Sequence, residues 1–396
     1  MLMNWKRKND KAMKKLFLFA LFAALCCSCS KDDQIDLYTI HVPKKGTLAA
    51  VLEEKGLNAG TIVSLKIIGE LNDEDFVMIR SMTNLVKIDL SEVNLPMLFE
   101  RAFSENQMIK KVTLPNNLET IGDYAFSDCR SLTSIKITST VETIGDYAFD
   151  ECFSLKTVTF ERDSQLKTIR DFAFHSCGSL TSIEIPEGVT TIGEAAFSGS
   201  GLASIKIPDS VTTIGEDAFS SSGLTSIKIP KNVETIERGV FSYCRSLTSI
   251  EIPEGVTTIG EEAFWHCSSL TSIKISKNVE TIGEKAFSNC TSLKTVTFEQ
   301  NSRIQTIKRE AFDESGIVIV DMSQCKRNDI TIEGYAFFDC PNLQLFKIGA
   351  NIPPRCNAAF GDINLYSVLK VPSGSIDAYK AATGWKRFAS ITGLDE

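Results

Sequence analysis

The side chains that could perform chemistry are few, and their spacing does not match a catalytic or metal site. The 396-residue chain contains three histidines, His41, His175 and His266, and no two of them lie at the spacing of zinc ligands. Because histidine is a common general base and metal ligand, neither a catalytic residue nor a bound metal is expected. The formal net charge of −8 repels phosphate backbones, which argues against nucleic acid as a partner. We therefore predict no enzymatic activity and no cofactor.

Cysteines are the most regularly placed of the reactive residues. Seven of the nine that follow residue 29 lie three residues after a phenylalanine: Cys129, Cys152, Cys177, Cys244, Cys267, Cys290 and Cys340. Serine takes the same position elsewhere, at Ser200, Ser222 and Ser315. This exchange favours a ladder of small buried thiols over a disulfide framework. Cys325 and Cys356 lie outside the pattern and could pair with each other.

A row of carboxylates follows the same repeat. Its members are Asp123, Asp146, Glu194, Glu216, Glu261 and Glu284. Rows of carboxylates can bind calcium or perform acid–base catalysis. Here each acid begins an expected short helical turn, whose free N–H groups favour a negative charge, so capping is the preferred interpretation. Near-identical repeats also present the same residue everywhere, and no nucleophile–base pair stands apart from them.

Unlike side chains gather where the repeat varies. Trp265 and His266 follow one repeated phenylalanine, Tyr243 follows the previous one, and Arg245 comes two residues after Tyr243. If successive repeats stack in register, these four form an aromatic and cationic patch on one edge, and His175 belongs to the same edge in an earlier repeat. Aromatic and arginine side chains supply most binding energy at protein interfaces, and flat rings also stack on sugars. We predict a ligand-binding edge here, with drift at exposed loop positions as the alternative.

A second candidate surface consists of Ser, Thr and charged residues along the expected strands. Its charged members are Lys136, Glu184, Lys206, Lys228, Glu251 and Lys274. Solenoids use extended mixed-charge surfaces of this kind to bind partners. Solvation of an ordinary outer face explains the pattern equally well.

The elements that would position these residues recur with a fixed period. Phenylalanine returns every 22–25 residues, at Phe103, Phe126, Phe149, Phe174, Phe197, Phe219, Phe241, Phe264, Phe287, Phe312, Phe337 and Phe360. A period of this size predicts a solenoid. Within each unit, isoleucines alternate along a short strand, which indicates one buried face. We expect about eleven coils at the 4.7–4.9 Å spacing of paired strands. A glycine slot, as at Gly122 and Gly145, suggests unusual backbone angles there.

The chain begins with a segment typical of export. Two lysines precede an apolar run at 16–25, which is too short to span a bilayer but fits a secretory signal. Small residues and cysteines follow, and this stretch resembles a bacterial lipoprotein signal. The resemblance implies removal of residues 1–28, a lipid on Cys29 and an outer-membrane location facing the exterior. Cys26 and Cys27 are alternative lipid acceptors.

The repeated unit SLTSIxIPxxVTTIGxxAFxxC resembles the BspA-like class of leucine-rich-repeat proteins on the surfaces of gut and oral bacteria. The resemblance covers residues 105–365 and extends to the tail VPSGSIDAYKAATGWKRF at 371–388. It implies an α/β leucine-rich-repeat solenoid, a right-handed superhelix rich in β-structure with short helical turns. It also implies adhesion to host proteins or to other cells.

The predicted organisation comprises a signal peptide at 1–28, a surface linker at 29–36, an N-terminal cap at 37–104, repeats at 105–365 and a C-terminal cap at 366–396. Caps are expected because an open solenoid exposes unpaired strand edges. The N-terminal cap begins with an expected strand from Leu37 to Val42 and an expected helix from Leu48 to Glu54. Trp385 is expected in the core of the C-terminal cap.

Together these features predict a non-catalytic, lipid-anchored binding module that faces the cell exterior and functions as a monomer. Its expected partner is a protein or glycan on a host or neighbouring cell, and it contacts the membrane only through the lipid. A glycan-capturing lipoprotein of a nutrient uptake system and a passive structural surface protein are the alternatives.

Overall fold

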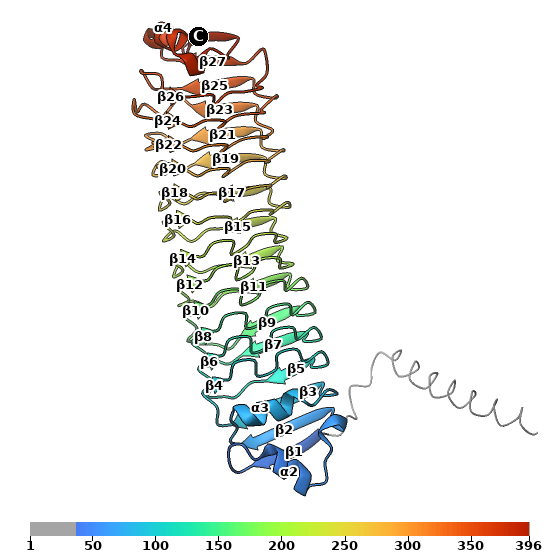
Figure 1. The fold of residues 1–396 in the computed structure, drawn as a ribbon. Helices are drawn as coiled ribbons and strands as arrows, with labels where there is room; N and C mark the ends of the chain where they lie inside the picture. Colours follow the sequence, from blue (N-terminus) through green and yellow to red (C-terminus); the bar gives the residue numbers. More distant parts are fainter. Residues whose placement is uncertain (1–36, 396) are drawn as a thin grey trace, which may run out of the picture. The chain divides into compact units, whose positions relative to one another are not determined.

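The computed structural model describes residues 37–395, which form a column of stacked parallel strands (Figure 1). The signal segment, the linker and Cys29 lie outside the described residues. Sixteen longer strands follow one another along the column: β1 Leu37–Val42, β2 Ser64–Gly69, β3 Lys87–Val93, β5 Lys111–Thr113, β7 Ser134–Ile137, β9 Thr157–Phe160, β11 Ser182–Glu184, β13 Ser204–Lys206, β15 Ser226–Lys228, β17 Ser249–Glu251, β19 Ser272–Ile275, β21 Thr295–Phe298, β23 Ile319–Met322, β25 Leu345–Ile348, β27 Val368–Val371 and β28 Ser390–Gly393. Their hydrogen-bonded ladder is interrupted between β9 and β11, between β13 and β15, and between β17 and β19.

A second series of two-residue strands runs along another side of the column. Its members are β4 Met97–Leu98, β6 Thr120–Ile121, β8 Thr143–Ile144, β10 Thr168–Ile169, β12 Thr191–Ile192, β14 Thr213–Ile214, β16 Thr235–Ile236, β18 Thr258–Ile259, β20 Thr281–Ile282, β22 Thr306–Ile307, β24 Thr331–Ile332 and β26 Arg355–Cys356. Neighbours pair in register, as Thr258 with Thr281 and Ile259 with Ile282, except between β14 and β16, where the series divides into two six-stranded sheets. In the ten Thr–Ile strands from β6 to β24 the isoleucine is buried, because adjacent residues of a strand face opposite sides.

The core is a continuous stack of aromatic rings. The twelve repeated phenylalanines are all buried, and the rings of successive coils lie nearly parallel with centroids 5.0–5.9 Å apart. We call this row the Phe ladder. One coil alone could not bury its ring, so the fold depends on stacking.

The predicted fold class is confirmed, and the stack is longer than the expected eleven coils. Twelve coils carry a Phe-ladder ring, and β1 and β2 precede them while β27 and β28 follow. The terminal segments therefore continue the sheet in register, as where Val368 of β27 pairs with Ser390 of β28. They extend the stack as well as covering its ends.

Helices are confined to the two ends of the described chain. They are α2 Leu48–Glu54, α3 Asp73–Arg80 and α4 Ile376–Ala381, with 3-10 turns η1 Ala59–Thr61, η2 Ser373–Ser375 and η3 Thr383–Trp385. The strand expected from Leu37 to Val42 and the helix expected from Leu48 to Glu54 are both present. Each helix within residues 37–395 falls short of the length and apolar character that a bilayer crossing needs.

The short helical turns expected inside the repeats are absent between Arg80 and Ser373, a fully described stretch. Tyr124 N–H instead donates to the Asp146 carbonyl of the next coil, 2.8 Å away, while Ala125 N–H donates to Gly122 at 3.2 Å. Bonds between coils thus alternate with tight turns inside each coil. The carboxylate row does not cap helices: Asp123 Oδ1 accepts from the N–H of Asp146, at 2.9 Å, and so ties adjacent coils together.

The glycine slot is also explained differently from the sequence-based expectation. Gly122 has no positive φ, whereas Tyr124, two residues later, has a φ of 55°. A Cβ on Gly122 would lie 2.3 Å from the carbonyl oxygen of Leu98 in the preceding coil. Close packing of coils therefore favours glycine there.

Both ends are closed by buried polar contacts. The Asp75 carboxylate accepts from the N–H groups of Gly46 at 2.8 Å and Leu48 at 2.9 Å, which fixes α3 against the start of α2. At the other end, the Trp385 indole N–H donates to the Pro354 carbonyl at 3.2 Å. Trp385 is fully buried, which confirms its predicted place in the cap core.

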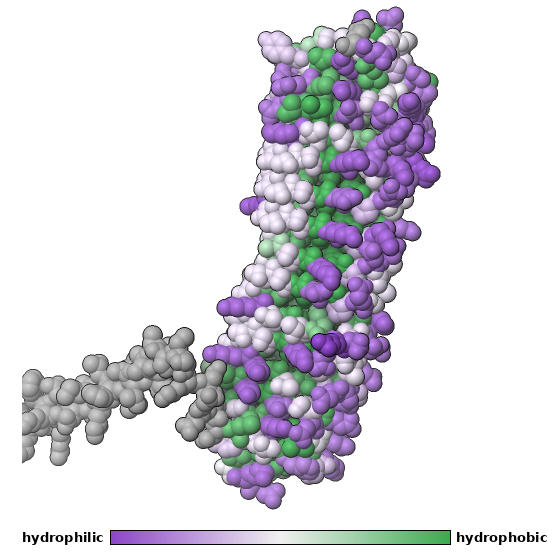
Figure 2. All heavy atoms as spheres, turned by 180° about the vertical axis from the view of Figure 1, so that it is seen from behind, coloured by the Kyte–Doolittle hydropathy of each residue, from purple (hydrophilic) through white to green (hydrophobic). Residues whose placement is uncertain are grey.

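Because the coils repeat, residues at equivalent sequence positions form rows along the column. Figure 2 shows weakly polar and charged residues gathered in separate columns along the length of one face. A residue that departs from its row is therefore conspicuous on an otherwise regular surface.

Candidate functional site

The side chains that vary most between coils lie on one edge of the solenoid. We call it the turn edge and define it as the four residues after each Phe-ladder ring. Its backbone is held by bonds between coils: Tyr243 N–H donates to Trp265 at 2.7 Å, and His266 N–H donates to Ser288 at 3.0 Å. Tyr243 and His266 both have a φ of 57°, a left-handed conformation that the two bonds maintain. The turn edge is thus a rigid support for its side chains.

Four of the five predicted binding residues meet on this edge, and we call them the aromatic patch. The Tyr243 ring lies 4.9 Å from Trp265 and 4.8 Å from His266, measured between ring centroids. The Arg245 guanidinium carbon lies 5.4 Å from the centroid of the Tyr243 ring, within cation–π range. The three rings are half-buried and Arg245 is exposed. The patch therefore offers apolar edges and a cation to an outside ligand.

Its electrostatics favour a neutral imidazole. Partial burial, and then the nearby Arg245 guanidinium, lower the pKa of His266 from 6.5, while Glu314 acts in the opposite direction. At neutral pH the ring is therefore uncharged and can stack on Tyr243. Arg245 remains the cation of the patch, since guanidinium groups stay protonated in proteins.

The fifth predicted residue, His175, lies elsewhere on the turn edge, in the coil of Phe174. Its Nδ1 is 2.7 Å from Asp150 Oδ1, and its Nε2 is 3.4 Å from Ser176 Oγ. Sequence reasoning found no nucleophile–base pair, and this serine–histidine–aspartate arrangement corrects that statement. The adjacent backbone donors are already used, because Ser176 N–H donates to Ser198 and Cys177 N–H donates to Phe174. An acyl-transfer site also needs free donors for the oxyanion, so this arrangement lacks a central part.

Metal chemistry has no support in the described part of the chain. Within residues 37–395, no group of three or more histidine, cysteine or acidic side chains is placed to hold a metal ion. The nine described cysteines are all free, and Cys325 and Cys356 do not pair.

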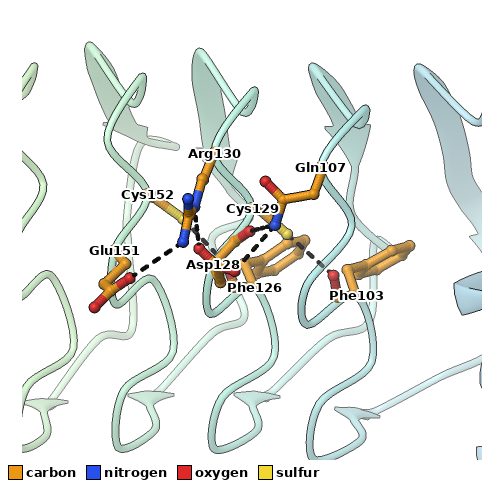
Figure 3. Close-up of polar contacts among 8 residues, drawn as sticks. All are labelled: Phe103, Gln107, Phe126, Asp128, Cys129, Arg130, Glu151 and Cys152. Carbon is orange, nitrogen blue, oxygen red and sulfur yellow. Dashed lines mark hydrogen bonds and ion pairs between the residues drawn. The ribbon is translucent and has the colours of Figure 1, made fainter. Parts of the chain in front are cut away.

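The cysteine ladder is structural, and its prediction as a row of buried thiols is confirmed. Cys129 Sγ donates to the Phe103 carbonyl at 3.1 Å, and Cys152 Sγ donates to Phe126 at 3.1 Å (Figure 3). Burial raises the pKa of Cys244 to about 11, which leaves the thiol protonated and able to donate. At the equivalent position of another coil, the Ser200 hydroxyl has no partner in the described structure. A C–O bond is shorter than a C–S bond, so a serine hydroxyl reaches less far than a cysteine thiol toward the phenylalanine carbonyl of a preceding coil.

Sequence reasoning missed a second aromatic and cationic pair on the turn edge. Phe153 is 43% exposed, and the Arg130 guanidinium carbon lies 5.5 Å from its ring centroid. Figure 3 shows Arg130 reaching Asp128, where Nε and Oδ1 are 2.5 Å apart, and pointing toward Glu151. The available signal was an aromatic residue directly after a ladder cysteine, in the run Cys152-Phe153.

A row of outward aromatics was missed as well. Tyr124, Tyr147 and Phe172 stack with centroids 4.8 and 4.6 Å apart, and Arg101 covers the free face of Tyr124. The signal was the repeated text GDYAF, GDYAF and RDFAF. The three rings of this row are half-buried, and their faces cover one another.

The strand face, the second predicted surface, is occupied by ion pairs between coils. Lys136 lies 2.7 Å from Glu161, and Lys206 pairs with Glu184. Beside them, where the ladder stops between β9 and β11, a shallow groove of about 510 Å³ is lined by residues that include Asp163 and Pro186. Exposed pairs of this kind contribute at most about 1 kcal/mol each. Lys274 is likewise paired, with Glu299 at 2.6 Å, whereas no ion pair within residues 37–395 involves Lys228 or Glu251.

Comparison with known proteins identifies the family. A model of the BspA-type leucine-rich-repeat region matches residues 96–225, 167–291, 213–344 and 257–380. Similar solved structures include a leucine-rich-repeat protein from Bacteroides ovatus, 20% identical, with TM-score 0.49 and coverage of 83% of this chain and 88% of that one. They also include a T. pallidum leucine-rich-repeat protein, 26% identical with TM-score 0.39 and coverage of 50% and 82%. A leucine-rich cell surface protein from Faecalibacterium prausnitzii is 24% identical, with TM-score 0.34 and coverage of 69% and 86%. No curated protein matches the chain. The family model spans more than half of the sequence, and the chain belongs to the BspA-type leucine-rich-repeat family.

Proposed function

We propose that this protein is a non-catalytic adhesion module that binds a macromolecule on a host or neighbouring cell through the aromatic patch. One observation carries the proposal: four unlike side chains, Tyr243, Arg245, Trp265 and His266, meet at solvent-accessible positions of two adjacent coils. Most other turn-edge positions carry small or acidic residues.

The physical properties of the patch suit recognition. Aromatic and arginine side chains dominate the binding energy of interfaces, and residues that are already ordered lose little conformational freedom on binding. Here Tyr243 and Trp265 are held by a bond between coils, with N and O 2.7 Å apart. A ligand would meet a preformed surface.

The proposed location follows from the first residues of the sequence. A lipid on Cys29, or on Cys26 or Cys27, would anchor the chain to the outer membrane with the solenoid facing outward. A rod that projects from the surface presents its long edges to other cells. A nucleic-acid partner is disfavoured by the net charge of −8.

The test is binding of the protein to an array of extracellular-matrix proteins and glycans, beside a Tyr243→Ala/Trp265→Ala variant. We expect specific retention on the array and its loss in the double variant. Tyr335→Ala is the matched control, because Tyr335 is an exposed aromatic residue in a distant coil. Absence of any specific retention would instead favour a passive structural role.

A further inference from the structure

The turn edge around the aromatic patch differs from the rest of that edge in charge. Six consecutive coils carry no Asp, Glu or Lys at these positions, which are residues 175–178, 198–201, 220–223, 242–245, 265–268 and 288–291. Acidic residues flank this stretch at both ends, with Asp150 and Glu151 before it and Asp313 and Glu314 after it. A surface about six coils long, on which Arg245 is the one arginine and acidic residues are absent, is therefore bounded by negative charge.

The middle of this surface carries only small side chains. The coils of Phe197 and Phe219 are each one residue shorter here, and their turn edges consist only of serine and glycine. A Cβ on Gly201 would lie 2.2 Å from the Gly178 carbonyl oxygen, so the shortened backbone runs close to the preceding coil. Gly199 and Ser221 are exposed and face solvent with little side chain. We call residues 198–201 and 220–223 the floor.

An aromatic and arginine pair lies beyond each end of the floor, with the coil of Phe174 between the floor and Phe153. Phe153 with Arg130 lies on one side, and Tyr243 with Arg245 lies on the other. Four coil steps separate the coils of Phe149 and Phe241, which corresponds to about 19 Å at the spacing of paired strands. The distance suits an extended ligand that lies along the column.

We propose that this surface binds a linear neutral glycan, with sugar rings against the aromatic groups at the two ends and hydroxyl groups over the floor. The inference rests on the proposed function and names its ligand class. Sugar rings pack their C–H faces on aromatic groups, and serine hydroxyls and exposed backbone groups can exchange hydrogen bonds with sugar hydroxyls. The acidic residues at both ends repel polyanions, which excludes sulfated and uronic acid polymers.

A protein ligand fits the floor less well. Protein interfaces rely on a few large side chains that enter pockets, whereas the floor presents only serine and glycine across two coils. Arg245 is the one arginine within the six-coil stretch, which has no Asp, Glu or Lys, and the pKa of His266 is lowered by partial burial and then by Arg245. A peptide partner would find few charges to pair with.

Affinity electrophoresis tests the proposal. The protein is run through native gels that contain xylan, galactomannan, mixed-linkage β-glucan or laminarin, with heparin and polygalacturonate as anionic comparisons. We expect retardation by at least one neutral polysaccharide and by neither polyanion. The Tyr243→Ala/Trp265→Ala variant should bind at least about tenfold more weakly, the loss of a single strong anchor.

Ser221→Glu is the sharper variant, because it adds length and negative charge to the floor without straining the fold. Glu151 occupies the equivalent position in another coil with a φ of 54°, close to the 57° of Ser221. Ser221→Glu should abolish retardation, whereas Thr213→Glu, which adds the same charge at an exposed position of β14, should leave it unchanged.

The outcomes separate this inference from the proposed function. Retardation that survives Ser221→Glu, or no retardation by any neutral polysaccharide, overturns the glycan assignment. If the array still shows protein binding that depends on Tyr243 and Trp265, the adhesion proposal stands without it. If neither assay shows binding, both proposals fail.

Discussion

Replacement of Phe241 by alanine measures how far the solenoid depends on the Phe ladder. The Phe241 side chain is 1% exposed, and its ring lies 5.9 Å from Phe219 and 5.3 Å from Phe264. Truncating a buried phenylalanine costs about 3–5 kcal/mol, of which two lost ring contacts account for about 1–3 kcal/mol. The cavity cannot close easily, because Phe241 N–H is bonded to Ala263 of the next coil at 2.9 Å. We expect the free energy of unfolding to fall by about 3–5 kcal/mol.

The assay is urea denaturation followed by far-UV circular dichroism. Tyr366→Ala serves as the matched control, since Tyr366 is 84% exposed and its loss should change stability by less than about 0.5 kcal/mol. A mid-stack defect can also uncouple the two halves of a solenoid, so the variant should show a broader transition. A Phe241→Ala curve that superimposes on the parent curve would refute the ladder as the source of stability.

Three further predictions concern the packing between coils. Cys152→Ser should lower the free energy of unfolding by about 1–3 kcal/mol, because the hydroxyl is buried short of the Phe126 carbonyl; equal urea midpoints for the two proteins would contradict this. Gly201→Ala should cost about 1–3 kcal/mol through its clash with the preceding coil. Gly178→Ala, whose added Cβ meets nothing within 4 Å, should be neutral, and similar melting temperatures for both variants would argue against the close approach. Burial, and then Glu314, Glu310 and Asp339, raise the pKa of Asp313 from 3.8 to about 6. The folded state therefore holds this proton more tightly, so stability is lost as pH rises from about 4 to about 6. Asp313→Asn should raise the urea midpoint at about pH 7.5 and change it little at about pH 4; a shift of equal size at both pH values would contradict the assignment.

The repeat made most of the fold predictable. Regular spacing of phenylalanine and alternation of isoleucine predict stacked strands and a buried ring in every coil, and the structure has both. The buried cysteine row followed from exchange with serine at one position. These features depend on local sequence, which each coil repeats.

The geometry of the turns was less predictable. The interpretation of Gly122 as a site of unusual backbone angles was wrong, because the left-handed residue is Tyr124 and glycine is favoured by contact with the previous coil. The expected helical turns were also wrong, since hydrogen bonds between coils replace those within a helix. Both errors arise because a single unit carries no information on the distance to its neighbour.

The candidate site, too, could be predicted from the sequence only in part. The sequence pattern placed Tyr243, Trp265 and His266 on one edge, and stacking in register brings their rings together. The contact between His175 and Asp150 was not foreseen, because the two residues belong to different coils and only the stacking distance joins them. The exposed Phe153 was overlooked because its neighbour Cys152 follows the regular repeat.

The most direct test of the central claim, that the turn edge is the binding surface, is acrylamide quenching of tryptophan fluorescence. Trp385 is fully buried, so in a Trp5→Phe protein the accessible fluorescence comes from Trp265. Quenching is measured with and without the ligand that the array or the gels identify. The account predicts that bound ligand shields Trp265 and lowers the quenching constant, and that Ser221→Glu removes this effect. Full binding with unchanged quenching of Trp265 would contradict the account and place the binding surface elsewhere on the solenoid.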